Sequence, residues 1–167
     1  SGFDPNEQIT GETLQAILHD IIDDHRSTNF FQSDEAFEEI LNPDPTGQGE
    51  VIGVYTLQPR FDFPNDWNRE HSWPSSLGVG DEGIAHDDLM ALFPADRRLN
   101  SARSNRFFDE CTPGVGQCES PASVGSGDTF LEAAEGSSQD RFTFSPPFET
   151  RGDLARAIFY LATRYDG

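Results

Sequence analysis

The sequence predicts an α+β fold in which short strands lie among helices, and three patterns support this class. Apolar residues recur every three or four positions near both ends of the chain, as in amphipathic helices. A β-branched and aromatic run at residues 51–57, bounded by Gly and Pro, indicates a strand. Residues 67–73 read as extended. A chain of 167 residues can form one domain, residues 1–167, with a buried core.

Two helices are expected before the first strand. The first runs from about residue 10 to residue 25, and the second from residue 34 to residue 41 after Ser33 as a cap. His19 and His25 lie on or near the first helix and are interpreted as ordinary surface or helix-end residues. The first helix carries one apolar stripe, made of Leu14, Ile17, Leu18, Ile21 and Ile22.

The middle of the chain is predicted to be irregular between its short elements. Residues 58–66 read as a loop, and residues 88–93 as a short strand or an irregular crossing. A helix is expected at residues 95–105, because it follows a proline. Residues 109–128 are rich in Gly, Pro and Ser and predict a long loop.

A short helical turn at residues 129–134 and a final helix complete the expected elements. The final helix follows Thr150 and buries one face, made of Leu154, Ala157, Ile158, Leu161 and Ala162.

The charge composition is unusual. The net charge is −19, and all eleven basic residues are arginines. Such a charge opposes binding to a polyanion at low salt and keeps a protein soluble at high salt. Two interpretations stay open: a chain adapted to high salt, or an ordinary acidic secreted protein. No apolar run is long enough for a membrane-spanning helix, so no membrane association is expected.

Cys111 and Cys118 are the two cysteines, and the residues between them favour turns. We expect them to form a disulfide, which indicates an oxidising compartment. A zinc site is the rival interpretation, but the CxxC spacing is absent and no histidine lies nearby.

The segments WNREHSWP (residues 67–74) and DLMALFPADRRLNSARSN (residues 88–105) carry the candidate chemistry. Glu70 and Asn100 present oxygen, which suits Mg²⁺ or Mn²⁺. His71 has the side chain whose pKa suits proton transfer at neutral pH. Neighbours on a strand point to opposite faces, so Glu70 and His71 can share a site only at a strand end, a bulge or an edge.

The arginines of this region match phosphate oxygens in geometry and charge. Arg103 is the candidate phosphate clamp, whereas Arg69 is expected to pair with a carboxylate. Further contacts with a phosphate backbone are expected from Arg97, Arg98 and Arg106. The alternative is that these three neutralise nearby acids.

These two segments, together with RGDLARAIFYLATRY (residues 151–165), resemble the bacterial endonuclease I family. NPDPTGQGEVIGVYT (residues 42–56) resembles the approach to that family's first core strand. The resemblance implies a ββα-metal (His-Me finger) core with short strands and surrounding helices. It also implies a secreted, extracellular or periplasmic nuclease.

The resemblance assigns roles to individual residues of this chain. His71 would be the general base that activates water, and Glu70 and Asn100 would bind Mg²⁺ or Mn²⁺. The reaction would be non-specific endonucleolytic hydrolysis of DNA, with RNA as a further substrate, giving 5′-phosphate ends. The chain would act as a monomer and contact the nucleic acid backbone without reading its sequence.

The chain departs from the family at Met90 and Ala91, where the family often has histidine or asparagine. It also stops where the family usually continues with an asparagine- and proline-rich tail, so either the domain is shortened or the sequence is a fragment. A second function, from another class, stays open: an acidic extracellular domain that binds cations or a partner and keeps the finger fold without catalytic activity.

Overall fold

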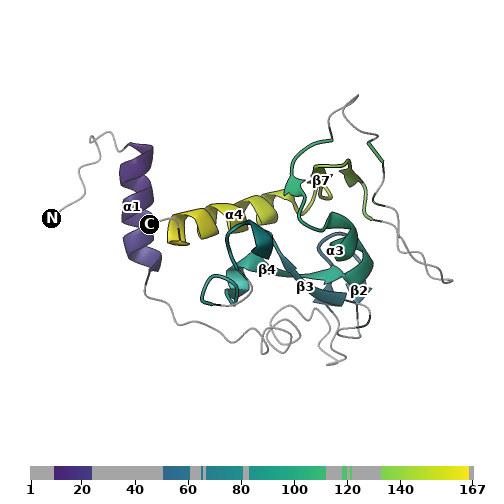
Figure 1. The fold of residues 1–167 in the computed structure, drawn as a ribbon, viewed down its shortest axis with the longest axis horizontal. Helices are drawn as coiled ribbons and strands as arrows, with labels where there is room; N and C mark the ends of the chain where they lie inside the picture. The colour runs from purple at the N-terminus through teal and green to yellow at the C-terminus, as the bar shows by residue number, and fades with distance from the viewer. Residues whose placement is uncertain are drawn as a thin grey trace.

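The computed structural model describes residues 10–23, 51–60, 65, 67–80, 83–111, 118–119, 121 and 133–165. Helices and short strands are mixed along the chain, which confirms the α+β class. Helix α1 lies beside the C-terminal end of the long helix α4, and β3, β4 and α3 lie together in the centre of the view (Figure 1). Among the described residues, no helix has both the length and the apolar character that crossing a membrane requires.

Helix α1 (Gly11–Ile22) confirms the first predicted helix. Thr10 caps it, because its side chain accepts a hydrogen bond from the Thr13 amide. The apolar stripe is present but exposed: Leu14, Ile17 and Leu18 are more than 40% exposed and Ile21 is 68% exposed. The helix contacts α4 through hydrogen bonds, which Gln15 and His19 form with the carbonyl oxygens of Ala162 and Thr163.

The strand predicted at residues 51–57 is shorter in the structure. β1 (Val51–Ile52) pairs with β2 (Pro59–Arg60), where the sequence predicted a loop. The chain turns between them: the Leu57 amide donates to the Gly53 carbonyl oxygen over 2.8 Å, and Leu57 has a φ of 55°. The second predicted helix, at residues 34–41, lies outside the described residues, as does most of the turn predicted at residues 129–134.

The central unit is an antiparallel strand pair followed directly by a helix. β3 (Trp67–His71) confirms the extended prediction and pairs with β4 (Leu92–Asp96). A single 3₁₀ turn, η3 (Leu89–Ala91), precedes β4. Helix α3 (Arg97–Arg103) starts two residues later than predicted, because the Asp96 carboxylate caps the amides of Arg98 and Leu99. A further 3₁₀ turn, η2 (Ser75–Leu77), follows β3.

A second sheet and the last helix pack beside this unit. β7 (Thr143–Ser145) lies between β5 (Phe107–Phe108), which is parallel to it, and β6 (Ser138–Gln139), which is antiparallel. Helix α4 (Arg151–Tyr165) confirms the final prediction. Of its predicted inner face, Leu154, Ala157 and Leu161 are buried, while Ile158 and Ala162 are half-buried.

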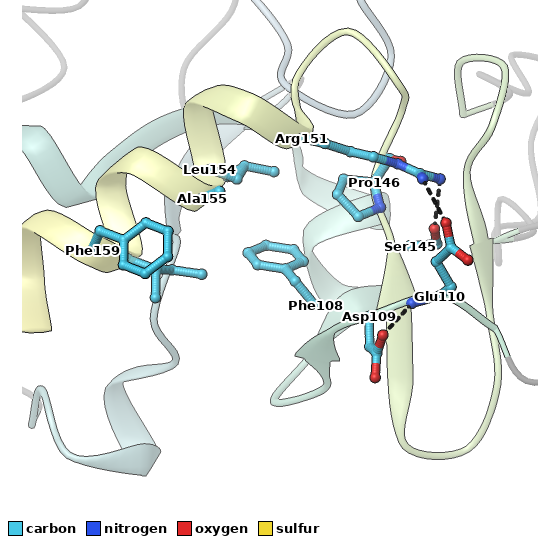
Figure 2. A pocket seen from close by; sticks show the side chains of 10 residues that line it. Phe108, Asp109, Glu110, Ser145, Pro146, Arg151, Leu154, Ala155 and Phe159 are labelled. Atoms are coloured by element: carbon cyan, nitrogen blue, oxygen red, sulfur yellow. Dashed lines mark hydrogen bonds and ion pairs between the residues drawn. The ribbon is translucent and has the colours of Figure 1, made fainter.

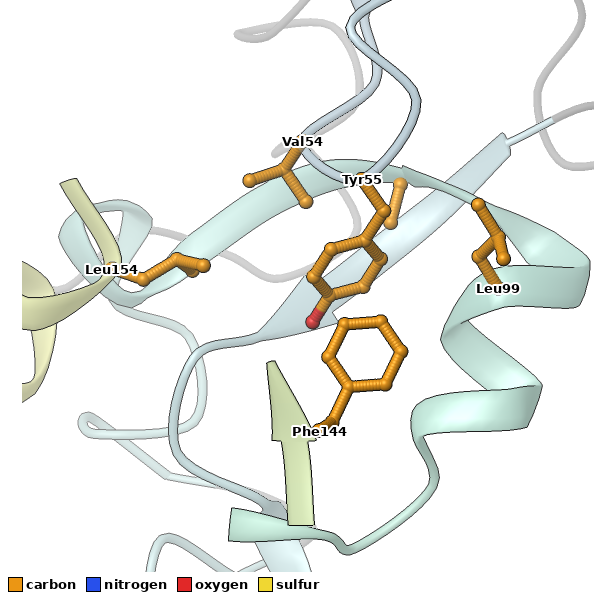
Figure 3. Packing of buried hydrophobic residues seen from close by; sticks show 6 residues of the cluster. Val54, Tyr55, Leu99, Phe144 and Leu154 are labelled. Carbon is orange, nitrogen blue, oxygen red and sulfur yellow. The ribbon is translucent and has the colours of Figure 1, made fainter. Parts of the chain in front are cut away.

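The main core joins these elements around the aromatic rings of Tyr55 and Phe144, which are fully buried and 4.8 Å apart (Figure 3). Burial of such large rings supplies much of the stabilisation of a small domain. The cluster also includes Val54, Ala95, Leu99 and Leu154. The Tyr55 hydroxyl points from this core towards β3, so the core contributes a polar atom to the neighbouring site.

Candidate functional site

A groove of about 430 Å³ follows β3 and α3. Its walls are mainly polar, and they bring together several residues that the sequence singled out. The groove is lined by Glu70, His71, Asn100 and Arg103, and also by Asn68, Arg69 and residues of the loops that follow β3 and α3.

Glu70 is buried at the bottom of this groove, with 2% of its surface exposed. Its Oε1 accepts a hydrogen bond from the Tyr55 hydroxyl over 2.7 Å and lies 2.8 Å from Nη1 of Arg103. Oε2 has no hydrogen bond within the described part of the chain. Burial raises the pKa of Glu70 to about 7, although the Arg103 charge and the Tyr55 hydrogen bond act in the opposite direction.

Arg103 is buried as well, at 2% exposure. Besides Glu70, its guanidinium donates to the carbonyl oxygens of His71 and Ser72, each over 3.0 Å. It also lies 4.5 Å from the centre of the Phe108 ring. Arg103 therefore supports Glu70 and the end of β3. These bonds use three of its five N–H groups, so the phosphate contact predicted for Arg103 stays a prediction.

Asn100 projects from α3 towards the open edge of β3. Its Nδ2 donates to Oδ1 of Asn68 over 2.8 Å and to the Arg69 carbonyl oxygen over 3.1 Å. An amide nitrogen has two hydrogens, so both are used. The amide is held with Oδ1 as its remaining polar atom, which is an oxygen ligand suited to a hard cation.

His71 is half-buried beside a second histidine that the sequence did not indicate. Its Nε2 lies 3.0 Å from the carbonyl oxygen of His86, and the two rings are 4.5 Å apart. A carbonyl oxygen only accepts, so Nε2 carries the hydrogen and the neutral ring has its lone pair on Nδ1. Burial lowers the pKa of His71 to about 4, and the charges of Arg69 and Arg103 contribute.

The segment that carries His86 is anchored to the C-terminal helix. Asp88 is buried, and its Oδ2 accepts hydrogen bonds from the hydroxyls of Tyr160 and Tyr165 over 2.9 and 2.8 Å. Its Oδ1 accepts from the Met90 amide. The carbonyl group that binds His71 therefore lies two residues from a fixed point on α4.

The open edge of β3 explains how neighbouring residues reach one groove. Glu70 faces Phe93 across the strand pair, and the carbonyl oxygens of its neighbours Arg69 and His71 accept hydrogen bonds from α3 instead of β4. Asn100 and Arg103 of α3 bind those two oxygens. The groove lies along this edge, where side chains from both faces of β3 are accessible, as the edge alternative of the sequence analysis requires.

The remaining predicted arginines lie outside the groove lining. Arg97 is exposed and Arg98 is half-buried, and neither is among the described residues that line the groove. The guanidinium of Arg106 donates to the carbonyl oxygens of Asp140, Ala102 and Arg103, which closes the end of α3. Arg69, which the sequence analysis expected to pair with a carboxylate, is one of the residues that line the groove.

The residues that sequence reasoning missed are Tyr55, Asn68 and His86. Asn68 lies two residues before Glu70, so its place on the same strand was a usable signal. Tyr55 and the His86 carbonyl group reach the site only through the fold.

The donor atoms fit a hard cation with few protein ligands. In the part of the chain that the structure describes, no group of three or more His, Cys, Asp or Glu side chains could hold a metal ion. Glu70 and Asn100 leave one oxygen each, and Mg²⁺ commonly keeps several waters beside one or two protein ligands.

The disulfide prediction is confirmed. Cys111 and Cys118 are joined, with Cα atoms 5.6 Å apart, and the bridge lies on the chain that leaves β5. No other cysteine is present.

Comparison with known proteins gives one family. The family model described as Endonuclease I matches residues 10–167. An extracellular ribonuclease of Bacillus subtilis (strain 168) is 33% identical over 171 residues, covering 99% of this chain and 54% of that protein. An extracellular ribonuclease of Bacillus amyloliquefaciens is 35% identical over 164 residues, covering 95% of this chain and 51% of that protein. The chain thus spans about half the length of these curated relatives. No solved structure gave a significant match.

Proposed function

This chain belongs to the endonuclease I family, and from that premise we propose that it is a metal-dependent nuclease that hydrolyses phosphodiester bonds. The observation that carries the proposal is the convergence of Glu70, His71 and Asn100 on one polar groove. The direct succession of β3, β4 and α3 supports a ββα-metal finger as the unit that presents them.

His71 acts as the general base. Its Nε2–H is held by the His86 carbonyl oxygen, so the ring offers Nδ1 to a water. Its lowered pKa keeps the imidazole neutral at neutral pH, which is the form that accepts a proton. His71 also cannot turn easily, because its ring packs against that of His86.

Glu70 and Asn100 would hold Mg²⁺ or Mn²⁺, because each keeps one side-chain oxygen that its internal hydrogen bonds do not use. The bound cation supplies Lewis acid chemistry, which offsets charge on the phosphate and on the leaving 3′ oxygen. Tyr55 and Arg103 orient Glu70, and Asn68 orients Asn100. Hydrolysis of the bond between the phosphorus and the 3′ oxygen leaves a 5′-phosphate end.

Arg69 and Arg103 are the two arginines that line the groove, and we assign contacts with a phosphate of the substrate to both. The role predicted for Arg103 is kept, because its bonds to Glu70, His71 and Ser72 leave its Nε–H and one Nη2–H unused among the described residues. Arg97 and Arg98 on the first turn of α3 add contacts with the phosphate backbone farther along. Contacts of this kind carry no sequence information, so cleavage is non-specific.

The substrate is DNA, RNA or both. The relatives from the two Bacillus species are named ribonucleases, which supports RNA, whereas the family model is that of an endonuclease. Their names also support an extracellular location, and the Cys111–Cys118 disulfide fits an oxidising compartment. One chain supplies all the proposed groups, so the proposed reaction needs no second subunit.

Incubation of the purified protein with plasmid DNA and with single-stranded RNA tests the proposal. Degradation should require Mg²⁺ or Mn²⁺, stop with EDTA and leave 5′-phosphate ends. Isothermal titration with Mn²⁺ in the absence of substrate separates the alternative. Binding of Mn²⁺ without turnover of either substrate would indicate an inactive cation-binding domain. A protein that neither binds Mn²⁺ nor cleaves either substrate would lead us to reject the proposed site.

A further inference from the structure

A second cavity, of about 300 Å³, lies between α4 and the strands β5 and β7 (Figure 2). One wall is a face of α4, because Arg151, Leu154, Ala155, Ile158 and Phe159 recur at helical spacing. The opposite wall comes from β5 and the end of β7, with Phe108, Ser145 and Pro146. The cavity is mostly apolar, with polar groups at one end.

Two phenylalanine rings mark the apolar part. The Phe108 ring is fixed from behind, because it makes edge contacts with Tyr55 and Phe144 at 6.5 and 6.4 Å. Phe159 is 73% exposed, which is high for so large an apolar side chain. A rigid ring and an exposed ring at one cavity are suited to a flat aromatic ligand.

The polar end disfavours a phosphate group. Arg151 is used internally, since it binds Ser145 Oγ over 2.8 Å and the carbonyl oxygens of Gly136 and Pro146. It is also paired with Glu110, whose carboxylate adds negative charge beside that of Asp109. Carboxylates repel a phosphate, but they accept hydrogen bonds from the amino groups of a neutral nucleobase.

Phe108 connects this cavity with the groove. The Arg103 guanidinium contacts Glu70 on one side and lies 4.5 Å from the Phe108 ring centre. One side chain thus separates the proposed metal ligand from the wall of the cavity. An unpaired base that turns out of a strand bound in the groove is the part of the substrate that would enter the cavity beside Phe108.

We infer that the Phe108–Phe159 cavity is a subsite for an unpaired nucleobase of a single-stranded substrate. This inference rests on the proposed nuclease function and names its substrate class. Stacking on aromatic rings tolerates every base and is absent for bases inside a duplex. It also suits a chain of net charge −19, because stacking does not depend on counterion release.

Binding measurements on a His71→Ala parent in Mg²⁺, which keeps the substrate intact, test the subsite. Fluorescence anisotropy would give the Kd of a labelled RNA hexa-adenylate, the matching DNA and a DNA duplex. Phe159→Ala should weaken binding of both single strands by about five- to a hundredfold, from the usual contribution of one stacked base. Duplex binding should change by less than about twofold, and Phe159→Trp should restore single-strand binding.

Phe142→Ala is the matched control, because Phe142 is similarly exposed at 58% but does not line the cavity. Three results would each overturn the subsite. The first is an equal loss of affinity in Phe142→Ala and Phe159→Ala, the second an equal loss for duplex and single strands, and the third no loss of affinity in Phe159→Ala. If the wild type cleaves and Phe159→Ala leaves the Kd of the single strands unchanged, the subsite is overturned but the proposed nuclease function survives. A parent that binds none of the probes overturns the subsite, and a wild type that also fails to cleave removes the proposed function.

Discussion

Glu70 Oε1 and Arg103 Nη1 lie 2.8 Å apart, and both side chains are about 98% withdrawn from solvent, at 2% exposure each. A buried carboxylate without its partner is costly, whereas removal of both charges together is tolerated much better. The contribution of this ion pair to the free energy of unfolding can therefore be tested separately from its effect on activity.

Arg103→Met should lower the free energy of unfolding by about 3–5 kcal/mol, because it leaves Glu70 buried without compensation. Arg97→Met, at an exposed position of the same helix, should stay within about 0.5 kcal/mol of the wild type. Urea unfolding followed by circular dichroism measures both. The double variant with Glu70→Gln should recover part of the loss. Equal stability of Arg103→Met and Arg97→Met would show that the ion pair has no structural role.

His71→Ala should lower kcat by about 10²- to 10⁴-fold, which is the usual contribution of a general base. Its affinity for Mn²⁺ should stay unchanged, because Glu70 and Asn100 are the proposed ligands. His19→Ala is the control, since His19 Nδ1 lies 3.0 Å from the Thr163 carbonyl oxygen of α4 and His19 is not among the residues that line the groove. Initial rates on plasmid and on RNA give the comparison, and residual activity above about one third of the wild type would reject His71 as the base.

Asn68→Ala should weaken Mn²⁺ binding by about 10- to 100-fold, as expected when the residue that orients a metal ligand is lost. In an Asn100→Ala background the same change should have no further effect, because the amide it orients is gone. Asn105→Ala, at an exposed rim position of the groove, should leave the affinity unchanged. Titration calorimetry of the four variants decides the point. Additive losses from Asn68 and Asn100 would mean that they act independently.

The pH dependence of stability should reveal two opposing contributions in the metal-free protein. Burial raises the pKa of Glu70 from 4.5 to about 7 and lowers that of His71 from 6.5 to about 4. Between pH 4.5 and 6.5, folding therefore takes up a proton at Glu70 and releases one at His71. Each contribution has a slope of about 1.4 kcal/mol per pH unit, and the two have opposite signs, so they cancel in the wild type.

Single variants expose each contribution. Relative to the wild type, Glu70→Gln should lose stability as the pH falls from 6.5, because only the His71 contribution remains. His71→Gln should instead gain stability as the pH falls from 7 to 4.5. Urea unfolding in EDTA across this range measures the differences. Parallel stability curves for the three proteins would contradict both pKa shifts.

Nuclease activity should rise from low salt to an optimum at several hundred millimolar NaCl. At such concentrations the Debye length is below about 5 Å. The net charge of −19 repels the substrate at long range, and screening removes this repulsion before it weakens the arginine contacts. Initial rates against NaCl at fixed Mg²⁺, with circular dichroism at each point, separate substrate approach from folding. A steady fall from the lowest salt with constant folding would show that the acidic surface has no influence.

The regular elements with clear periodicity were predictable from the sequence. The apolar spacing of α1 and α4 and the extended character of β3 need only local information. The error at residues 51–57 has a local cause too, because a β-branched run does not reveal the turn in which Leu57 adopts a positive φ. Helix α3 starts later than predicted because Asp96 caps it, and the sequence alone does not show which residue of this stretch is the cap.

The candidate site was predictable only in its most polar members. Glu70, His71 and Asn100 line one groove, as expected from residue chemistry and resemblance. The burial of Arg103 could not be predicted, since it depends on carbonyl oxygens at the end of β3, about thirty positions earlier. Tyr55 and His86 contribute through a hydroxyl from the core and a backbone carbonyl group, and neither has a sequence signature.

The two tyrosine hydroxyls on Asp88 have a practical consequence for storage and handling of the protein. Both donors lie in the last turns of α4, and the segment that they hold aligns His71. Nicking or fraying of those turns would release this segment while the ring core around Phe144 stays folded. A preparation cut within this helix would then lose activity while its melting curve stays unchanged, and intact mass analysis would detect the cut that a thermal assay overlooks.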